Sequence, residues 1–130
     1  MRYMILLIFL LCGCSPIDIE PAKKIANEFH EIYKVSEYSK IYKAGSTQFH
    51  SVTTEEEFIN FMKTAKERDL GDYKKSTLKF ERATNSLFSN NEISLIYFSE
   101  YSKRIVQEIF MFEIENGTVK LKGYRYDSIN

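Results

Sequence analysis

The feature that most constrains the fold of this chain is a change in the spacing of its apolar residues at Gly71. Before Gly71, apolar residues recur every three or four positions, which is the period of an amphipathic helix. After Gly71 the period falls to two and the apolar runs become long, as in β-strands. Helices followed by strands predict an α+β fold, with the helices packed on one face of the sheet.

Three helices are expected before Gly71. Residues 21–34 begin with Pro21, which suits a first helical turn, and place an apolar stripe on one face. Ser36 is expected to cap a short second helix that ends at residues 44–46. A third helix is predicted over about 54–69, because residues 54–57 (Thr-Glu-Glu-Glu) have the spacing of a capping box.

Four strands are expected after Gly71, over residues 76–83, 93–101, 105–114 and 118–126. Asn116-Gly117 predicts a tight hairpin between the last two, since both central positions of such a turn need a positive φ. The result would be a curved four-stranded antiparallel meander. Its inward positions in the second and third strands are expected to be Ile, Leu, Phe, Met and Tyr.

Residues 1–14 (MRYMILLIFLLCGC) have the pattern of a secretory signal, with one positive charge at Arg2 before an apolar run. The run is too short to span a bilayer, which needs about 20 apolar residues. Leu11-Cys12-Gly13-Cys14 resembles the lipobox of bacterial lipoproteins. The resemblance implies cleavage after Gly13 and lipidation of Cys14, with palmitate among its acyl chains.

Two alternatives stand beside this interpretation. Cys14 could be a free or disulfide-bonded thiol, and Cys12 could be the lipidated residue, although the bulky Leu10-Leu11 precedes it. We therefore expect a signal peptide over residues 1–13, the lipidated Cys14 and a tether over 14–20, and a single domain over 21–130.

The anchor predicts a location in the cell envelope, with the membrane as a partner. Ser15 stands where an Asp would favour retention in the inner membrane of a Gram-negative cell. The sequence thus resembles lipoproteins sorted to the outer membrane, and the domain would face the periplasm. In a Gram-positive cell, the same anchor would lie on the outer face of the only membrane.

Composition narrows the classes of partner. Eighteen Lys and Arg residues balance eighteen Asp and Glu residues, so the chain lacks the basic surface that nucleic-acid binding requires. No nucleic acid is expected as a partner. With 44% hydrophobic residues, the chain is expected to fold around a real core.

The order of elements resembles the nuclear-transport-factor-2-like (NTF2-like) or cystatin-like cone, and within it small secreted families of unknown function of the DUF4019 type. The resemblance covers most of residues 21–126 and rests on Ile32-Tyr33, residues 38–42, Phe49, Phe58, Phe61, residues 68–71, Glu108 and Gly123-Tyr124. That superfold includes enzymes, ligand carriers and assembly modules, so the resemblance implies a fold and no single function.

Few residues could supply catalytic or metal chemistry. His30 and His50 are the only histidines, and both are expected to be solvated or partly buried at the surface. Glu100, Glu108 and Glu113 are expected to face solvent or to pair with Lys103, Arg104 or Lys120. We therefore expect no metal, no cofactor and no catalytic residues.

Six tyrosines are candidates for ligand binding, because their rings and hydroxyls could line the mouth of a cavity. They are Tyr38, Tyr42, Tyr97, Tyr101, Tyr124 and Tyr126. The alternative is that they form the rim of the core. The sequence favours a non-enzymatic envelope lipoprotein that binds a protein partner or a small apolar ligand. The alternatives are an NTF2-like enzyme that uses a strand carboxylate and a tyrosine, and an immunity or inhibitor lipoprotein.

Overall fold

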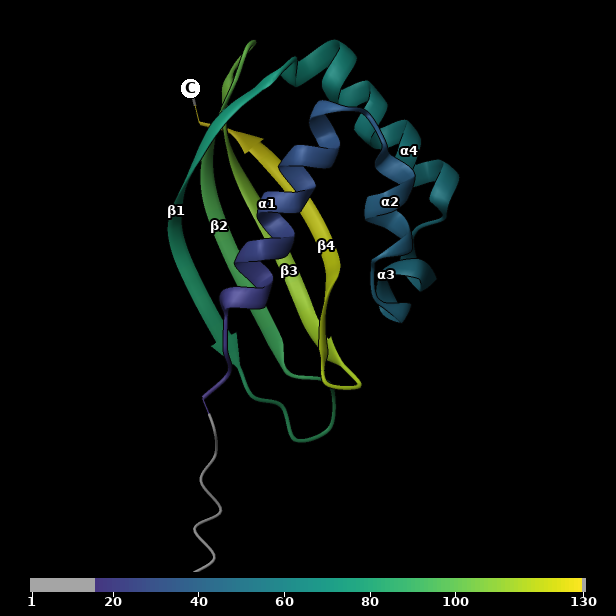
Figure 1. The fold of residues 1–130 in the computed structure, drawn as a ribbon, viewed down its shortest axis with the longest axis vertical. Helices are drawn as coiled ribbons and strands as arrows, with labels where there is room; N and C mark the ends of the chain where they lie inside the picture. The colour runs from purple at the N-terminus through teal and green to yellow at the C-terminus, as the bar shows by residue number, and fades with distance from the viewer. Residues whose placement is uncertain (1–15, 130) are drawn as a thin grey trace, which may run out of the picture.

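A computed structural model describes residues 16–129 and has an α+β fold, in which helices are followed by a four-stranded antiparallel sheet (Figure 1). This confirms the predicted fold class. The elements in chain order are α1 (Glu20–Lys34), α2 (Tyr38–Lys43), α3 (Thr47–Val52), α4 (Glu55–Thr64), the π-helix η1 (Ala65–Leu70), β1 (Tyr73–Thr84), β2 (Glu92–Tyr101), β3 (Ile105–Glu115) and β4 (Thr118–Ser128). The predicted signal peptide and Cys14 lie outside the described residues.

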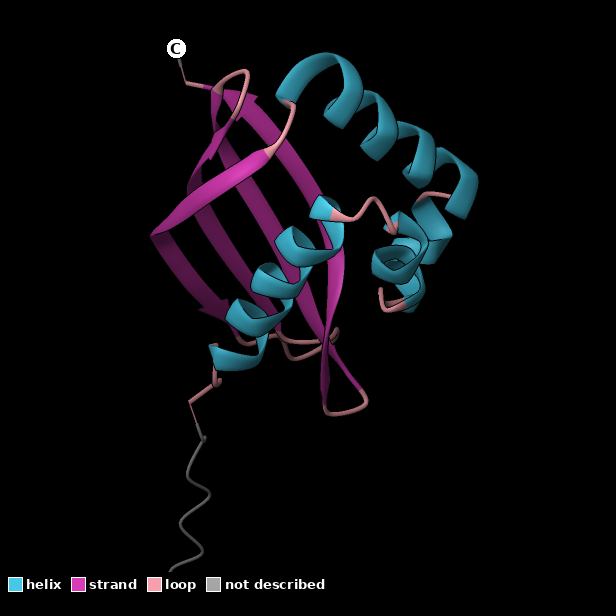
Figure 2. Cartoon of the chain, turned by 45° about the horizontal axis from the view of Figure 1, so that its top comes forward, coloured by secondary structure: helices cyan, strands magenta, loops and turns pink. Residues whose placement is uncertain are grey.

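The sheet is an open meander in the order β1-β2-β3-β4. The β3–β4 turn is the predicted Asn116-Gly117 hairpin, with φ values of 51° and 78°. All helices lie on one side of the sheet, and α1 runs across its inner face (Figure 2). The last described residues of β4 lie at the end of the sheet opposite to the start of α1 (Figure 1).

The core forms between α1 and the inner face of the sheet. On α1, Phe29 is buried and its ring packs edge-on against the Phe110 ring, with 5.1 Å between the ring centroids. Alternate residues of β2 and β3 point inward because side chains of a strand alternate between its faces. The inward residues that are buried include Ile93, Leu95, Tyr97, Val106, Phe110 and Phe112.

The helical half differs from the prediction in three places. Ser36 does not cap α2, because the N-cap residue is Glu37, whose side chain makes no capping hydrogen bond. Helix α3 was not expected: Ser46, assigned to the end of the preceding helix, also caps a new one by accepting a hydrogen bond from the Phe49 N–H. The predicted third helix begins as expected, with Thr54 accepting from the Glu57 N–H at 3.2 Å. Its last turn, however, is the π-helix η1.

The expected inward set of the strands was partly wrong. Met111 lies on the outer face and is 38% exposed, because the inward positions of β3 are the even-numbered ones. Two polar residues take inward positions instead: Ser99 on β2 and Glu108 on β3 are both fully buried.

Candidate functional site

A cleft of about 270 Å³ opens between α1, α2 and the start of β4. Ile25, Phe29 and Ile32 reach it from α1 because residues three and four apart lie on one face of a helix. Val119 and Leu121 alternate along β4 and share its inward face. Ile41 of α2 and Ala44, which directly follows α2, complete the apolar lining.

Four polar side chains border the cleft: Glu28, Lys40, Thr118 and Lys120. Both lysines have acidic neighbours, since Lys40 pairs with Glu37, and Lys120 lies 3.6 Å from Glu115. Their charges are therefore largely balanced by the protein. The cleft is best suited to an uncharged, mainly apolar occupant.

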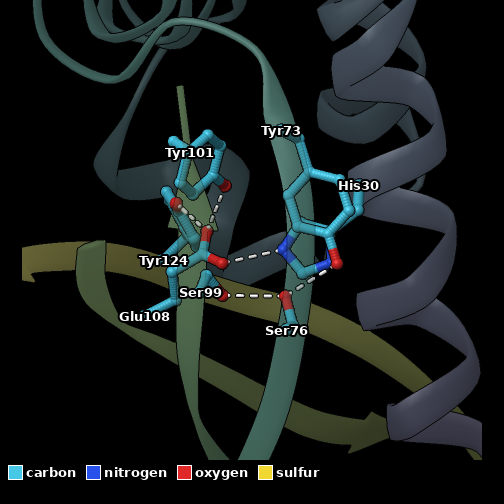
Figure 3. Close-up of polar contacts among 7 residues, drawn as sticks. All are labelled: His30, Tyr73, Ser76, Ser99, Tyr101, Glu108 and Tyr124. Carbon is cyan, nitrogen blue, oxygen red and sulfur yellow. Dashed lines mark hydrogen bonds and ion pairs between the residues drawn. The ribbon is translucent and has the colours of Figure 1, made fainter. Parts of the chain in front are cut away.

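A second feature is a polar network at the centre of the molecule, built around Glu108 (Figure 3). The Glu108 side chain has no exposed surface. Its Oε1 lies 2.8 Å from Nε2 of His30, and its Oε2 accepts a hydrogen bond of 2.8 Å from the Tyr101 hydroxyl. The Tyr124 hydroxyl donates to the same Oε2.

The network joins α1 to all four strands of the sheet. His30 comes from the inner face of α1 and stacks on the Tyr73 ring of β1, with 4.1 Å between ring centroids. The Tyr73 hydroxyl contacts Ser76 Oγ at 2.8 Å, and Ser76 Oγ contacts Ser99 Oγ at 2.8 Å (Figure 3). Tyr101 and Tyr124 reach Glu108 from the neighbouring strands β2 and β4.

The charges of the network follow from these contacts. Burial raises the pKa of Glu108, but the interaction with His30 and the hydrogen bonds from Ser99 and Tyr124 together outweigh burial and hold this pKa below its ordinary value. Burial and the adjacent Glu108 carboxylate raise the pKa of Tyr101 and of Tyr124, so both hydroxyls stay protonated and donate. The carboxylate is thus ionised and surrounded by donors, which fixes α1 on the sheet.

Two expectations about these residues were wrong. His30 is 2% exposed and Glu108 is fully buried, whereas both were expected near solvent. The signal for Glu108 was its place in the alternation of β3, where it shares a face with Val106 and Phe110. His30 follows Ala26 by four residues, so it also falls on the apolar stripe of α1.

The other candidate residues of the sequence lie as follows. His50 is exposed, and its Nε2 lies 2.6 Å from the Tyr42 carbonyl oxygen. Glu100 pairs with β1 lysines, at 3.7 Å from Lys75. Glu113 was expected to face solvent or to pair with a surface cation, but its side chain is largely buried, at 4% exposure.

The structure does not gather the six candidate tyrosines around one mouth, and none of them lines the cleft. Tyr38 and Tyr97 are buried in the core, and Tyr101 and Tyr124 bind Glu108. The Tyr42 hydroxyl donates to the Thr53 carbonyl at 2.8 Å. The Tyr126 hydroxyl donates to Asp69 at 2.8 Å, and burial together with this carboxylate raises the pKa of Tyr126 to about 12.

Among residues 16–129, no group of three or more His, Cys, Asp or Glu side chains is placed to hold a metal ion. No helix in the described part of the chain is long and apolar enough to cross a membrane. Neither a protein-family model nor a curated protein matches the chain.

Proposed function

We propose that this protein is a lipid-anchored component of a bacterial cell envelope that binds a small apolar ligand in the cleft between α1, α2 and β4. The cleft carries the proposal, because apolar side chains from three elements converge there without filling the space between them. The N-terminal sequence supports the location, with Cys14 as the lipidated residue. The proposed activity is binding and not catalysis.

The size of the cleft limits the ligand. Cavities of about 150 Å³ bind benzene, and drug-sized ligands need roughly 300–1,000 Å³. The cleft, at about 270 Å³, lies between these sizes. It suits a molecule with one or two rings, or a short acyl chain, whose polar end would lie near Thr118 and Lys120 at the border.

The main alternative from the sequence is an enzyme that uses a strand carboxylate and a tyrosine. Glu108 and Tyr101 are such a pair, 2.8 Å apart. A general base must reach the proton that it removes, directly or through one water. Glu108 has no exposed surface and already accepts from its neighbours, which favours a structural role for this pair and supports binding as the function.

Titration of ¹⁵N-labelled protein with octan-1-ol and with indole tests the proposal, using residues 15–130 after their folding has been verified by circular dichroism. We expect saturable shifts of amide signals confined to α1, α2 and the start of β4. Ala44→Phe places a ring in the cleft and should abolish these shifts. Ala83→Phe, at an exposed position of β1 that does not line the cleft, should leave them unchanged.

Two results would contradict the proposal. Shifts that grow without saturating would indicate non-specific contact with the surface. Shifts that persist in Ala44→Phe would place the binding site elsewhere.

A further inference from the structure

The loop between β1 and β2 exposes two large apolar side chains almost completely. Leu87 is 93% exposed and Phe88 is 99% exposed. The next most exposed large apolar residue in the described part of the chain is Val52, at 70%. Adjacent apolar residues at such exposure favour contact with another apolar phase.

The loop is held in a shape that projects this pair. The Ser86 N–H donates to Asn91 Oδ1 at 2.9 Å, and the Ser86 and Ser89 hydroxyls lie 2.6 Å apart. The Ile114 N–H donates to the Asn91 carbonyl at 2.9 Å, which ties the loop to β3. Residues 85–91 (NSLFSNN) contain no charged side chain, so the loop can leave water without desolvating an ion.

The loop lies at the end of the molecule where the described chain begins. Residues 16–19, the start of α1 and the β1–β2 loop are at the same end of the sheet in both views (Figures 1 and 2). Lys23 in the first turns of α1 lies 3.6 Å from Glu81 near the end of β1. The β1–β2 loop and the start of the described chain therefore lie at one end of the protein.

The chain between the domain and Cys14 is short. Ile17 and Ile19 pack against the core, so the part fixed to the domain begins at Ile17. Cys14 precedes Ile17 by three residues, which span at most about 10 Å when extended. A lipid attached to Cys14 would hold this end of the domain at the surface of the bilayer.

We propose that Leu87 and Phe88 insert into the bilayer to which the chain is anchored, as a second membrane contact; this rests on the lipid anchor of the proposed function. Burial of apolar side chains among acyl chains is favourable, and the anchor keeps them at high effective concentration near the membrane. Two contacts at one end fix the orientation of the domain, with α1 pointing away from the bilayer.

The chain contains no tryptophan, so a single introduced tryptophan reports only on its own position. Phe88→Trp places this probe at the tip of the loop. Val35→Trp is the matched control, because Val35 is 62% exposed and follows the last residue of α1. A helix of 15 residues is about 22 Å long, so the control lies far from the proposed contact.

Both variants are expressed as full-length lipoproteins and reconstituted into phosphatidylcholine vesicles with or without brominated acyl chains. Bromine quenches a tryptophan only at close range. We expect a blue-shifted emission for Phe88→Trp and a loss of fluorescence in brominated vesicles, with no change for Val35→Trp. Leu87→Trp should repeat the result of Phe88→Trp.

Flotation of the vesicles separates the two proposals. If the protein floats but both loop variants remain unquenched, the lipid anchor is supported and the loop contact is overturned. Equal quenching of the loop variants and of Val35→Trp would also overturn the loop contact. Protein that does not float overturns both proposals.

Discussion

Removal of the His30 side chain tests whether the buried network holds α1 on the sheet. In His30→Ala, the Glu108 carboxylate loses its His30 partner and keeps the hydroxyl donors of Tyr101, Tyr124 and Ser99. Removing the partner of a buried carboxylate costs about 3–5 kcal/mol, because the remaining charge is uncompensated. Since small domains have free energies of unfolding of roughly 5–15 kcal/mol, this variant should be close to unfolding.

Glu108→Gln is the matched control, because it keeps the shape of the side chain and removes its charge. The amide oxygen can accept from both tyrosine hydroxyls, and the NH₂ group then faces Nε2 of His30. The NH₂ group can donate a hydrogen bond to His30 only if the imidazole is neutral and its Nε2 is the acceptor. The loss is then limited to the charge-assisted part of the hydrogen bonds, about 1–3 kcal/mol.

The free energies of unfolding of the wild type and of Glu108→Gln should also depend differently on pH. The pKa of Glu108 is lower in the folded protein than its ordinary value of 4.5. Such a carboxyl stabilises the fold above its unfolded pKa, and this contribution is lost as the pH falls through the folded pKa. The stability advantage of the wild type over Glu108→Gln should therefore shrink below a pH of about 4.5.

Urea unfolding followed by circular dichroism measures these differences at neutral pH and through the acidic range. Nitrogen chemical shifts of His30 would report which ring nitrogen carries the proton in each form. A cost for His30→Ala below about 1 kcal/mol, or smaller than that of Glu108→Gln, would refute the reasoning, because a buried carboxylate without its partner destabilises the fold by more than this.

Further predictions concern the anchor and the core. Cys14→Ser should leave the precursor uncleaved and unlabelled by radioactive palmitate, and continued labelling would reject Cys14 as the lipidated residue. Phe29→Ala and Phe112→Ala should each lower the free energy of unfolding by about 3–5 kcal/mol, since both rings are buried; a loss below about 1 kcal/mol at both would show that the faces are misassigned. In a Gram-negative host, the wild type should fractionate with outer-membrane markers and Ser15→Asp should shift toward the inner membrane, whereas wild-type protein among inner-membrane markers would contradict the sorting argument.

The sequence determined the elements whose signals are local. The apolar period of residues 21–34, the capping box at Thr54 and the Asn116-Gly117 turn each depend on residues a few positions apart. The α+β class followed from their order. Helix α3 was missed although Ser46 is a good capping residue, because the same residues were already assigned to the end of the helix before it.

The tertiary structure alone decided how the polar residues are used. His30 and Glu108 are 78 positions apart, and their pairing exists only because α1 lies on the inner face of the sheet. The cleft likewise forms from α1, α2 and β4, which are separated in the chain. A local pattern can give the face on which a residue lies, but whether a carboxylate on that face is solvated or paired depends on what packs against it, and that partner comes from another part of the chain.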